Sequence, residues 1–170
     1  MALGLSSGTV RVVPYDPAWP RLFTEEADRI RGVLGDLPVV LEHTGSTAVP
    51  GLAAKPILDI LGGHPQDGDV SSYIAAIKRA GYVHRGEQGI PGRHFFRRGD
   101  PRSFHLHLAV RNGSFWREHL TFRDALRRDP GLRAEYEGLK LALAARYPSD
   151  RESYIDGKTA FVRNVLMGLR

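Results

Sequence analysis

The stretch HTGSTAVPGLAAKPILDIL, residues 43–61, decides the fold because it connects two predicted strands through a loop that carries polar side chains. The apolar run at residues 39–42 predicts a strand that ends at this loop. Residues 56–61 predict a second strand, and Gly62 and Gly63 mark its expected end. Loops placed by strands in this way commonly carry binding residues. We therefore expect the functional site here.

The turn Gly45-Ser46-Thr47 has the composition of a phosphate-binding loop. Glycine lets backbone N–H groups approach a phosphate closely, and the two hydroxyls can donate to its oxygens. A plain turn is the alternative interpretation. Lys55, later in the same loop, either holds a phosphate as a point charge or is simply exposed.

Asp59 stands among aliphatic residues in the predicted strand ILDIL, residues 57–61. Burying an ionised carboxylate costs several kcal/mol unless a cation or strong donors compensate. We therefore expect a metal ion or a basic partner beside Asp59. A carboxylate that caps a loop or pairs with an arginine is the alternative.

The run FHLHL, residues 104–108, alternates and places His105 and His107 on one face of a strand. Two neighbouring imidazoles can ligate one metal ion or act as an acid/base pair. A half-buried structural role is the alternative. The sequence does not tell which strand lies beside Asp59.

Further basic residues suit an anionic ligand. Glu87 and Arg93 bracket a glycine- and proline-bearing loop that could close over a ligand. The helical segment with Arg123, Arg127 and Arg128, and the pair Tyr154 and Lys158 one turn apart, could bind a triphosphate or a nucleic-acid backbone. Solvated surfaces balanced by Asp124 and Asp129 are the alternative.

Over the rest of the chain, the pattern of apolar and turn-forming residues predicts one domain, residues 1–170, built as a mixed β-sheet flanked by helices. We expect strands at 10–13, 39–42, 56–61, 82–85, 94–98 and 103–110. Helices are expected near 20–34, ending at Gly35, and from the cap Asp69 to Gly81. A helical C-terminal region follows residue 114, and Pro130 and Pro148 divide it. The predicted fold class is α/β or α+β.

The amino-acid composition limits which classes of protein function fit this chain. The chain has 170 residues with 42% hydrophobic and 25% charged residues, typical of a globular protein. The absence of cysteine excludes disulfides and thiol nucleophiles. A net charge of +5 favours an anionic partner, and a solvated arginine-rich surface is the alternative. With no leader-like or membrane-spanning run, we expect a cytoplasmic protein.

Four ordered motifs resemble the GrpB family, which is similar to a minimal nucleotidyltransferase. They are HTGSTAVPGLAAKPILDIL, EQGIPGRHFF, FHLHLAV and the helical FRDALRRDP with EYEGLKLALAARYPSDRESYIDGKTAFV, spread over residues 10–165. The resemblance implies a metal-dependent transfer in which two ions, Mg²⁺ or Mn²⁺, activate a hydroxyl and stabilise departing pyrophosphate.

Gly45, Ser46 and Asp59 match that pattern, but Leu61 stands where a second carboxylate is expected. The later strand offers His105 and His107 where an acid is usual, and imidazole suits manganese or zinc better than magnesium. The resemblance thus implies an incomplete site.

We expect transfer of a nucleoside monophosphate from a nucleoside triphosphate to a hydroxyl acceptor. The roles assigned are catalysis for Asp59, His107 and Lys55; nucleotide binding for Gly45, Ser46, Thr47, Lys55, Arg93 and Lys158; and metal binding for Asp59, His105 and His107. Nucleic acid or a coenzyme A-related metabolite is a further expected partner, the latter because some relatives are fused to dephospho-coenzyme A kinases. A non-catalytic nucleotide- or nucleic-acid-binding module and a metal-dependent phosphohydrolase are the alternatives.

Overall fold

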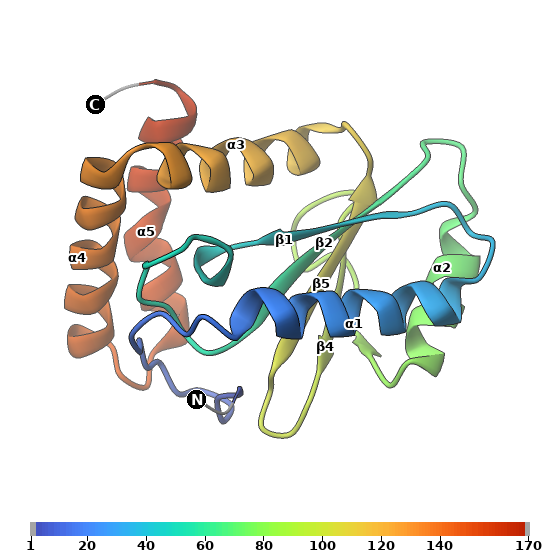
Figure 1. Ribbon diagram of the computed structural model, residues 1–170, viewed down its shortest axis with the longest axis horizontal. Helices are drawn as coiled ribbons and strands as arrows, with labels where there is room; N and C mark the ends of the chain where they lie inside the picture. The colour runs from blue at the N-terminus through green and yellow to red at the C-terminus, as the bar shows by residue number, and fades with distance from the viewer. Residues whose placement is uncertain (1–2, 169–170) are drawn as a thin grey trace.

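A computed structural model describes residues 3–168 and shows one five-stranded sheet with helices packed around it (Figure 1). The strands are β1 (Val40–Thr44), β2 (Leu58–His64), β3 (Val83–His84), β4 (His94–Arg98) and β5 (Phe104–Val110). The helices are α1 (Trp19–Leu34), the 3₁₀ turn η1 (Ser46–Ala48), α2 (Val70–Arg79), α3 (Ser114–Arg128), α4 (Pro130–Arg146) and α5 (Arg151–Leu166).

The sheet order is β1-β2-β5-β4-β3. β2 and β5 run parallel, whereas the β1–β2, β4–β5 and β3–β4 pairs are antiparallel. The predicted fold class, a mixed sheet flanked by helices with a helical C-terminal region, is confirmed. In Figure 1, α4 and α5 lie side by side at one end of the molecule, and α2 lies at the opposite end.

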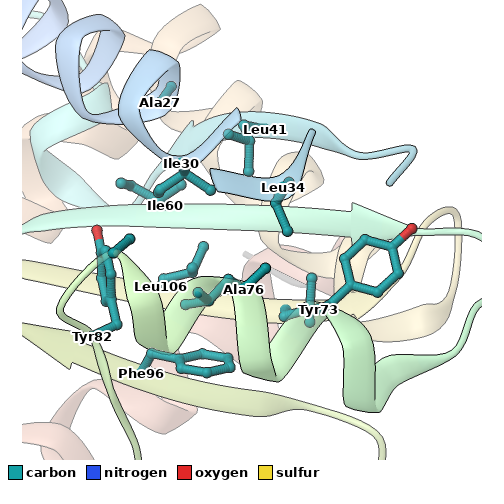
Figure 2. Packing of buried hydrophobic residues seen from close by; sticks show 13 residues of the cluster. Ala27, Ile30, Leu34, Leu41, Ile60, Tyr73, Ala76, Tyr82, Phe96 and Leu106 are labelled. Carbon is teal, nitrogen blue, oxygen red and sulfur yellow. The ribbon is translucent and has the colours of Figure 1, made fainter. Parts of the chain in front are cut away.

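One face of the sheet packs on α1 and α2 to form the main hydrophobic core (Figure 2). Strand alternation sends Ile60, Leu106 and Phe96 to this face, where each is 0% exposed. The helices contribute the stripe that includes Ile30 and Ile77. The polar residues that alternate with these apolar ones along the strands therefore point to the opposite face of the sheet.

Local signals placed the helix ends correctly. Gly35 follows the last residue of α1 with a φ of 58°, and the Asp69 carboxylate accepts a hydrogen bond from the Ser71 amide at the start of α2. Pro130 begins α4, and Pro148 lies between α4 and α5. Within residues 3–168, no helix is long and apolar enough to span a membrane.

One predicted strand is absent and others differ in extent: β1 runs to Thr44 rather than ending at Glu42, and β2 begins at Leu58 rather than at residue 56. Residues 10–13 form no strand, because their backbone bonds two separate segments: the Val10 amide donates to Pro148 O and Val13 forms an isolated bridge with Ala54. β2 does not end at Leu61 but continues through the glycines to His64. A Cβ on Gly63 would lie 2.5 Å from the Trp116 ring, so here glycine admits a close tryptophan rather than ending the strand.

Candidate active site

A row of polar side chains crosses four strands on the face away from the main core. Thr44 pairs with Asp59, Asp59 with His105, and His105 with Arg97, so all four project to the same side. Neighbouring strands are about 4.8 Å apart, and the row therefore spans roughly 14 Å. The parallel pairing of β2 with β5 answers the question that the sequence left open, since His105 is the direct neighbour of Asp59.

Asp59 is the single carboxylate in this row, and two imidazoles hold it. His105 Nδ1 lies 3.1 Å from Asp59 Oδ1, and His107 Nε2 lies 3.8 Å from the same oxygen. Burial by itself raises the pKa of Asp59, but hydrogen bonding by His105 and His107 outweighs it and holds the pKa well below its ordinary value. Asp59 is therefore an anion at neutral pH.

Arg93 orients one of these imidazoles. Its Nη1 is 3.2 Å from His107 Nδ1, so this nitrogen accepts and Nε2 carries the proton that faces Asp59. Burial lowers the pKa of His105 and of His107. Both rings are thus neutral at physiological pH, and each uses one N–H group on the Asp59 side.

The glycine turn lies directly against Asp59. Gly45 has a φ of 69°, and a Cβ there would be 2.5 Å from Asp59 Oδ2. The turn is fixed from the other side by His43, which stacks on Phe23 with ring centroids 4.8 Å apart and bonds Thr47 Oγ1 at 3.0 Å. Burial lowers the pKa of His43 to about 4, so this imidazole stays neutral and acts as a fixed support.

A cavity of about 560 Å³ opens over the row and is closed by α3, α4 and α5. Such a volume lies within the usual range for small-molecule sites. All of the predicted site residues line it: Gly45, Ser46, Thr47, Lys55, Asp59, Arg93, His105, His107 and Lys158. The opposite wall is largely apolar, with Phe122, Leu126 and Val162 among its side chains.

Three lysines, Lys55, Lys140 and Lys158, line this cavity. Among residues 3–168, none of the three has a carboxylate partner within 4 Å. Burial lowers the pKa of Lys55 and of Lys140 to about 7, and that of Lys158 to about 8. Lys55 and Lys158 lie over the Tyr154 ring, at 5.1 and 4.5 Å from its centroid. The geometry leaves their charge available to an anion.

Other side chains predicted to contact a ligand instead form hydrogen bonds within the protein. Arg123 donates to Glu42 Oε2 at 2.7 Å and to His43 O at 3.0 Å, while Arg127 donates twice to Ala48 O. The Glu87 carboxylate accepts from the Gly92 amide and shapes its own loop. Thr47 lines the cavity, but its hydroxyl bonds His43.

Sequence reasoning missed several cavity residues on the C-terminal helices, among them Lys140 and His119. Lys140 is 1% exposed and donates to Ala53 O, and the neighbouring Glu137 accepts from the Ala53 amide at 2.7 Å. Together they hold the loop that leads to β2. His119 also lines the cavity, with its ring centroid 6.1 Å from that of His107. Each interrupts an apolar helical stripe, which is the signal that could have identified it.

The donor set does not fit the pair of carboxylate-bound metal ions that the resemblance implies. Leu61 is 0% exposed, and the carboxylate opposite it on β1, Glu42, is paired with Arg123 at 2.7 Å. Within residues 3–168, no group of three or more His, Asp or Glu side chains is arranged to hold a metal ion. A divalent ion on Asp59, His105 and His107 stays a prediction of the sequence.

Comparison with known proteins gives consistent matches. The family model described as GrpB protein matches residues 9–167. The UPF0157 protein YqkA of Bacillus subtilis is 37% identical over 91% of this chain, which spans only 45% of that protein. The glutamate-rich protein GrpB of Alkalihalophilus pseudofirmus is 36% identical, with 96% of this chain and 98% of that protein covered. The crystal structure of conserved protein GrpB from Enterococcus faecalis matches with a TM-score of 0.85 at 35% identity, covering 93% and 96%.

Proposed function

The chain belongs to the GrpB family, and from that premise we propose that it transfers a nucleoside monophosphate from a nucleoside triphosphate to a hydroxyl group. One observation carries the proposal. Three lysines without an ion-pair partner among residues 3–168 line the same cavity as the ionised carboxylate of Asp59 and the glycine-serine turn. The sequence resemblance to nucleotidyltransferases gives the reaction class.

The cavity divides into a polar floor and an apolar wall, which suits a nucleotide. Lys55, Lys140 and Lys158 would bind the phosphate oxygens beside Gly45 and Ser46. Phe122 and Val162 on the helical wall offer apolar contact to the base. Arg93 adds a further positive charge to the cavity, beside His107.

In the proposed step, an acceptor hydroxyl oxygen bonds to the α-phosphorus while the bond from that phosphorus to the bridging oxygen breaks. Pyrophosphate leaves with the electron pair, and the hydroxyl proton passes to the Asp59 carboxylate. Asp59 is assigned this role because it is ionised and because its side chain, which lines the cavity, is 31% exposed. His105 and His107 hold the carboxylate in place.

The test uses labelled nucleoside triphosphates with an acceptor panel of RNA, a coenzyme A-related alcohol and small phosphorylated alcohols. Parallel reactions contain Mg²⁺, Mn²⁺ or a chelator, which tests the predicted metal requirement. We expect labelled product and pyrophosphate, and loss of both in Asp59→Asn with nucleotide binding retained. Nucleotide bound by the wild type with no transfer to any acceptor would refute the reaction.

A non-catalytic nucleotide- or nucleic-acid-binding module is the second candidate, and the Glu42–Arg123 pair favours it. On the described strands, that pair and the buried Leu61 leave Asp59 as the one carboxylate of this sheet face that is free of an arginine. Salt separates the two ligand classes: affinity for a nucleic-acid backbone falls linearly with log salt, whereas binding in an enclosed cavity is less sensitive. Steep salt dependence without transfer would favour the module.

A further inference from the structure

Three arginines meet at the far end of the polar row, and we call Arg97, Arg102 and Arg151 the arginine cluster. Arg97 stands on β4 opposite His105, Arg102 lies in the turn before β5, and Arg151 is the first residue of α5. Arg97 and Arg151 line the main cavity. Arg97 and Arg102 also line a second cavity of about 300 Å³, so Arg97 stands between the two.

No member of the cluster forms an ion pair in the described part of the chain. No carboxylate of residues 3–168 lies within 4 Å of any of the three guanidinium groups. Arg102 is 9% exposed, and both its Nε and its Nη2 are buried without a hydrogen-bond partner. The Nε atoms of Arg97 and Arg151 are likewise unpartnered. Burial, and after it the charges of Arg151 and Arg102, lowers the pKa of Arg97 to about 10.

Other arginines of this chain show how the fold treats a structural guanidinium. Arg123, which is also 9% exposed, bonds Glu42 and Asp124, and Arg98 bonds Glu26 at 2.7 Å. A buried cation without a partner is costly to a fold. Arg102 is such a group, and the half-buried Arg97 and Arg151 beside it each keep a buried Nε without a partner, so a bound anion would offset that cost.

Phosphate is the anion that this chemistry suits best. Guanidinium groups offer forked donors that match phosphate oxygens, and a dianion can be shared by several of them. Lys140 and Lys158 come from α4 and α5 and line the main cavity, but they do not line the second cavity, which Arg97 and Arg102 line. The arginine cluster therefore reaches a region that these two lysines do not reach.

We propose that the arginine cluster binds a phosphate group on the acceptor, so that the acceptor is a small phosphomonoester with a free hydroxyl. This proposal rests on the proposed function. The backbones of Asp59 and Arg97 are two strand spacings apart, about 10 Å, and an arginine side chain shortens that separation. A phosphate held by the cluster places a hydroxyl a few bonds away beside Asp59, while the donor phosphates occupy the lysine side.

Calorimetric titration with three probes tests the proposal: inorganic phosphate, glycerol 3-phosphate and glycerol. We expect both phosphates to bind and glycerol not to bind. Arg102→Gln and Arg151→Gln should weaken glycerol 3-phosphate binding by about tenfold or more, the factor that one lost charge-assisted hydrogen bond gives. Arg117→Gln, which removes the same charge from an exposed site on α3, should leave the affinity unchanged.

The donor side provides the opposite pattern. Lys158→Gln should weaken nucleoside triphosphate binding and spare glycerol 3-phosphate, whereas Arg102→Gln should do the reverse. If the triphosphate does not bind, the proposed function is refuted. The phosphate titrations still test the arginine cluster, because they contain no triphosphate. Equal phosphate affinity in the wild type and Arg102→Gln overturns the inference, as does a triphosphate loss in Arg102→Gln as large as that in Lys158→Gln.

Thermal unfolding separates binding from a structural role. Because Arg102 is an unpaired buried charge, Arg102→Gln should melt at the wild-type temperature or above it without phosphate. Phosphate should raise the melting temperature of the wild type and not that of the variant. A variant that is destabilised without phosphate, yet gains as much from phosphate as the wild type, contradicts the proposal.

Discussion

Replacing Gly45 by alanine tests whether the glycine turn positions the Asp59 carboxylate. Gly45 has a φ of 69° and a ψ of −174°, a region that is essentially restricted to glycine. The new Cβ would lie 2.5 Å from Asp59 Oδ2 and 3.1 Å from Asp59 Cβ. The turn or the carboxylate must therefore move, and the turn is already held by His43 through Thr47.

The expected loss of stability follows from the backbone angles of Gly45. A residue forced into that backbone region costs about 1–3 kcal/mol. In a domain of this size, each kcal/mol changes the melting temperature by about 2–4 °C, so Gly45→Ala should melt roughly 2–12 °C below the wild type. Displacement of the Asp59 carboxylate should also abolish the proposed transfer.

Gly138→Ala is the matched control, because Gly138 lies within α4 and a Cβ there meets nothing within 4 Å. Alanine in a helix interior stabilises by about 0.5–1 kcal/mol relative to glycine, so this variant should melt slightly above the wild type. Both melts are followed by circular dichroism. The reasoning about the turn is wrong if Gly45→Ala melts with the wild type while Gly138→Ala behaves as stated.

Two further perturbations test the electrostatics. Burial lowers the pKa of Lys55 and Lys140 to about 7, against 10.5 for an ordinary lysine, so the unfolded chain binds more protons than the folded protein above pH 7. The free energy of unfolding of the ligand-free protein, measured with urea, should therefore rise from about pH 7 to about pH 9. Lys140→Met should make this rise smaller. Triphosphate affinity should fall over the same interval, and a pH-independent affinity would contradict the assignment of the lysines. Arg123→Met leaves Glu42 and the His43 carbonyl without their donor and should cost about 1–3 kcal/mol in urea unfolding. Arg117→Met, at an exposed position, should cost almost nothing, and equal losses in the two variants would sink this account of Arg123.

The elements that sequence reasoning placed correctly are those whose signals are local. A helix cap depends on residues a few positions away, as at Asp69 and Gly35. The strand errors arose from remote partners. Nothing near Val13 indicates that it bridges Ala54, and nothing near Gly63 indicates that Trp116, more than fifty residues later in the chain, packs over it. Such contacts depend on the tertiary fold.

The same distinction applies to the site. Alternation on one strand predicted that His105 and His107 share a face, and their positions confirm it. The placement of His105 beside Asp59 requires a parallel pairing of strands that are far apart in the sequence, which one sequence does not specify. The arginine cluster left no local signal, because its members come from β4, a turn and α5.

The charge distribution of the cavity links stability to ligand binding. His105 and His107 are neutral and hold Asp59 by hydrogen bonding, so the charge of a single carboxylate is set against three lysines and the arginine cluster. Those cations are partly desolvated and repel one another, which is why burial and neighbouring charge both lower the pKa of Lys55. A phosphorylated ligand supplies the negative charges that the chain lacks. The free energy that desolvated cations cost in the empty protein is therefore recovered on binding, and phosphates should stabilise this fold more than uncharged analogues of the same size.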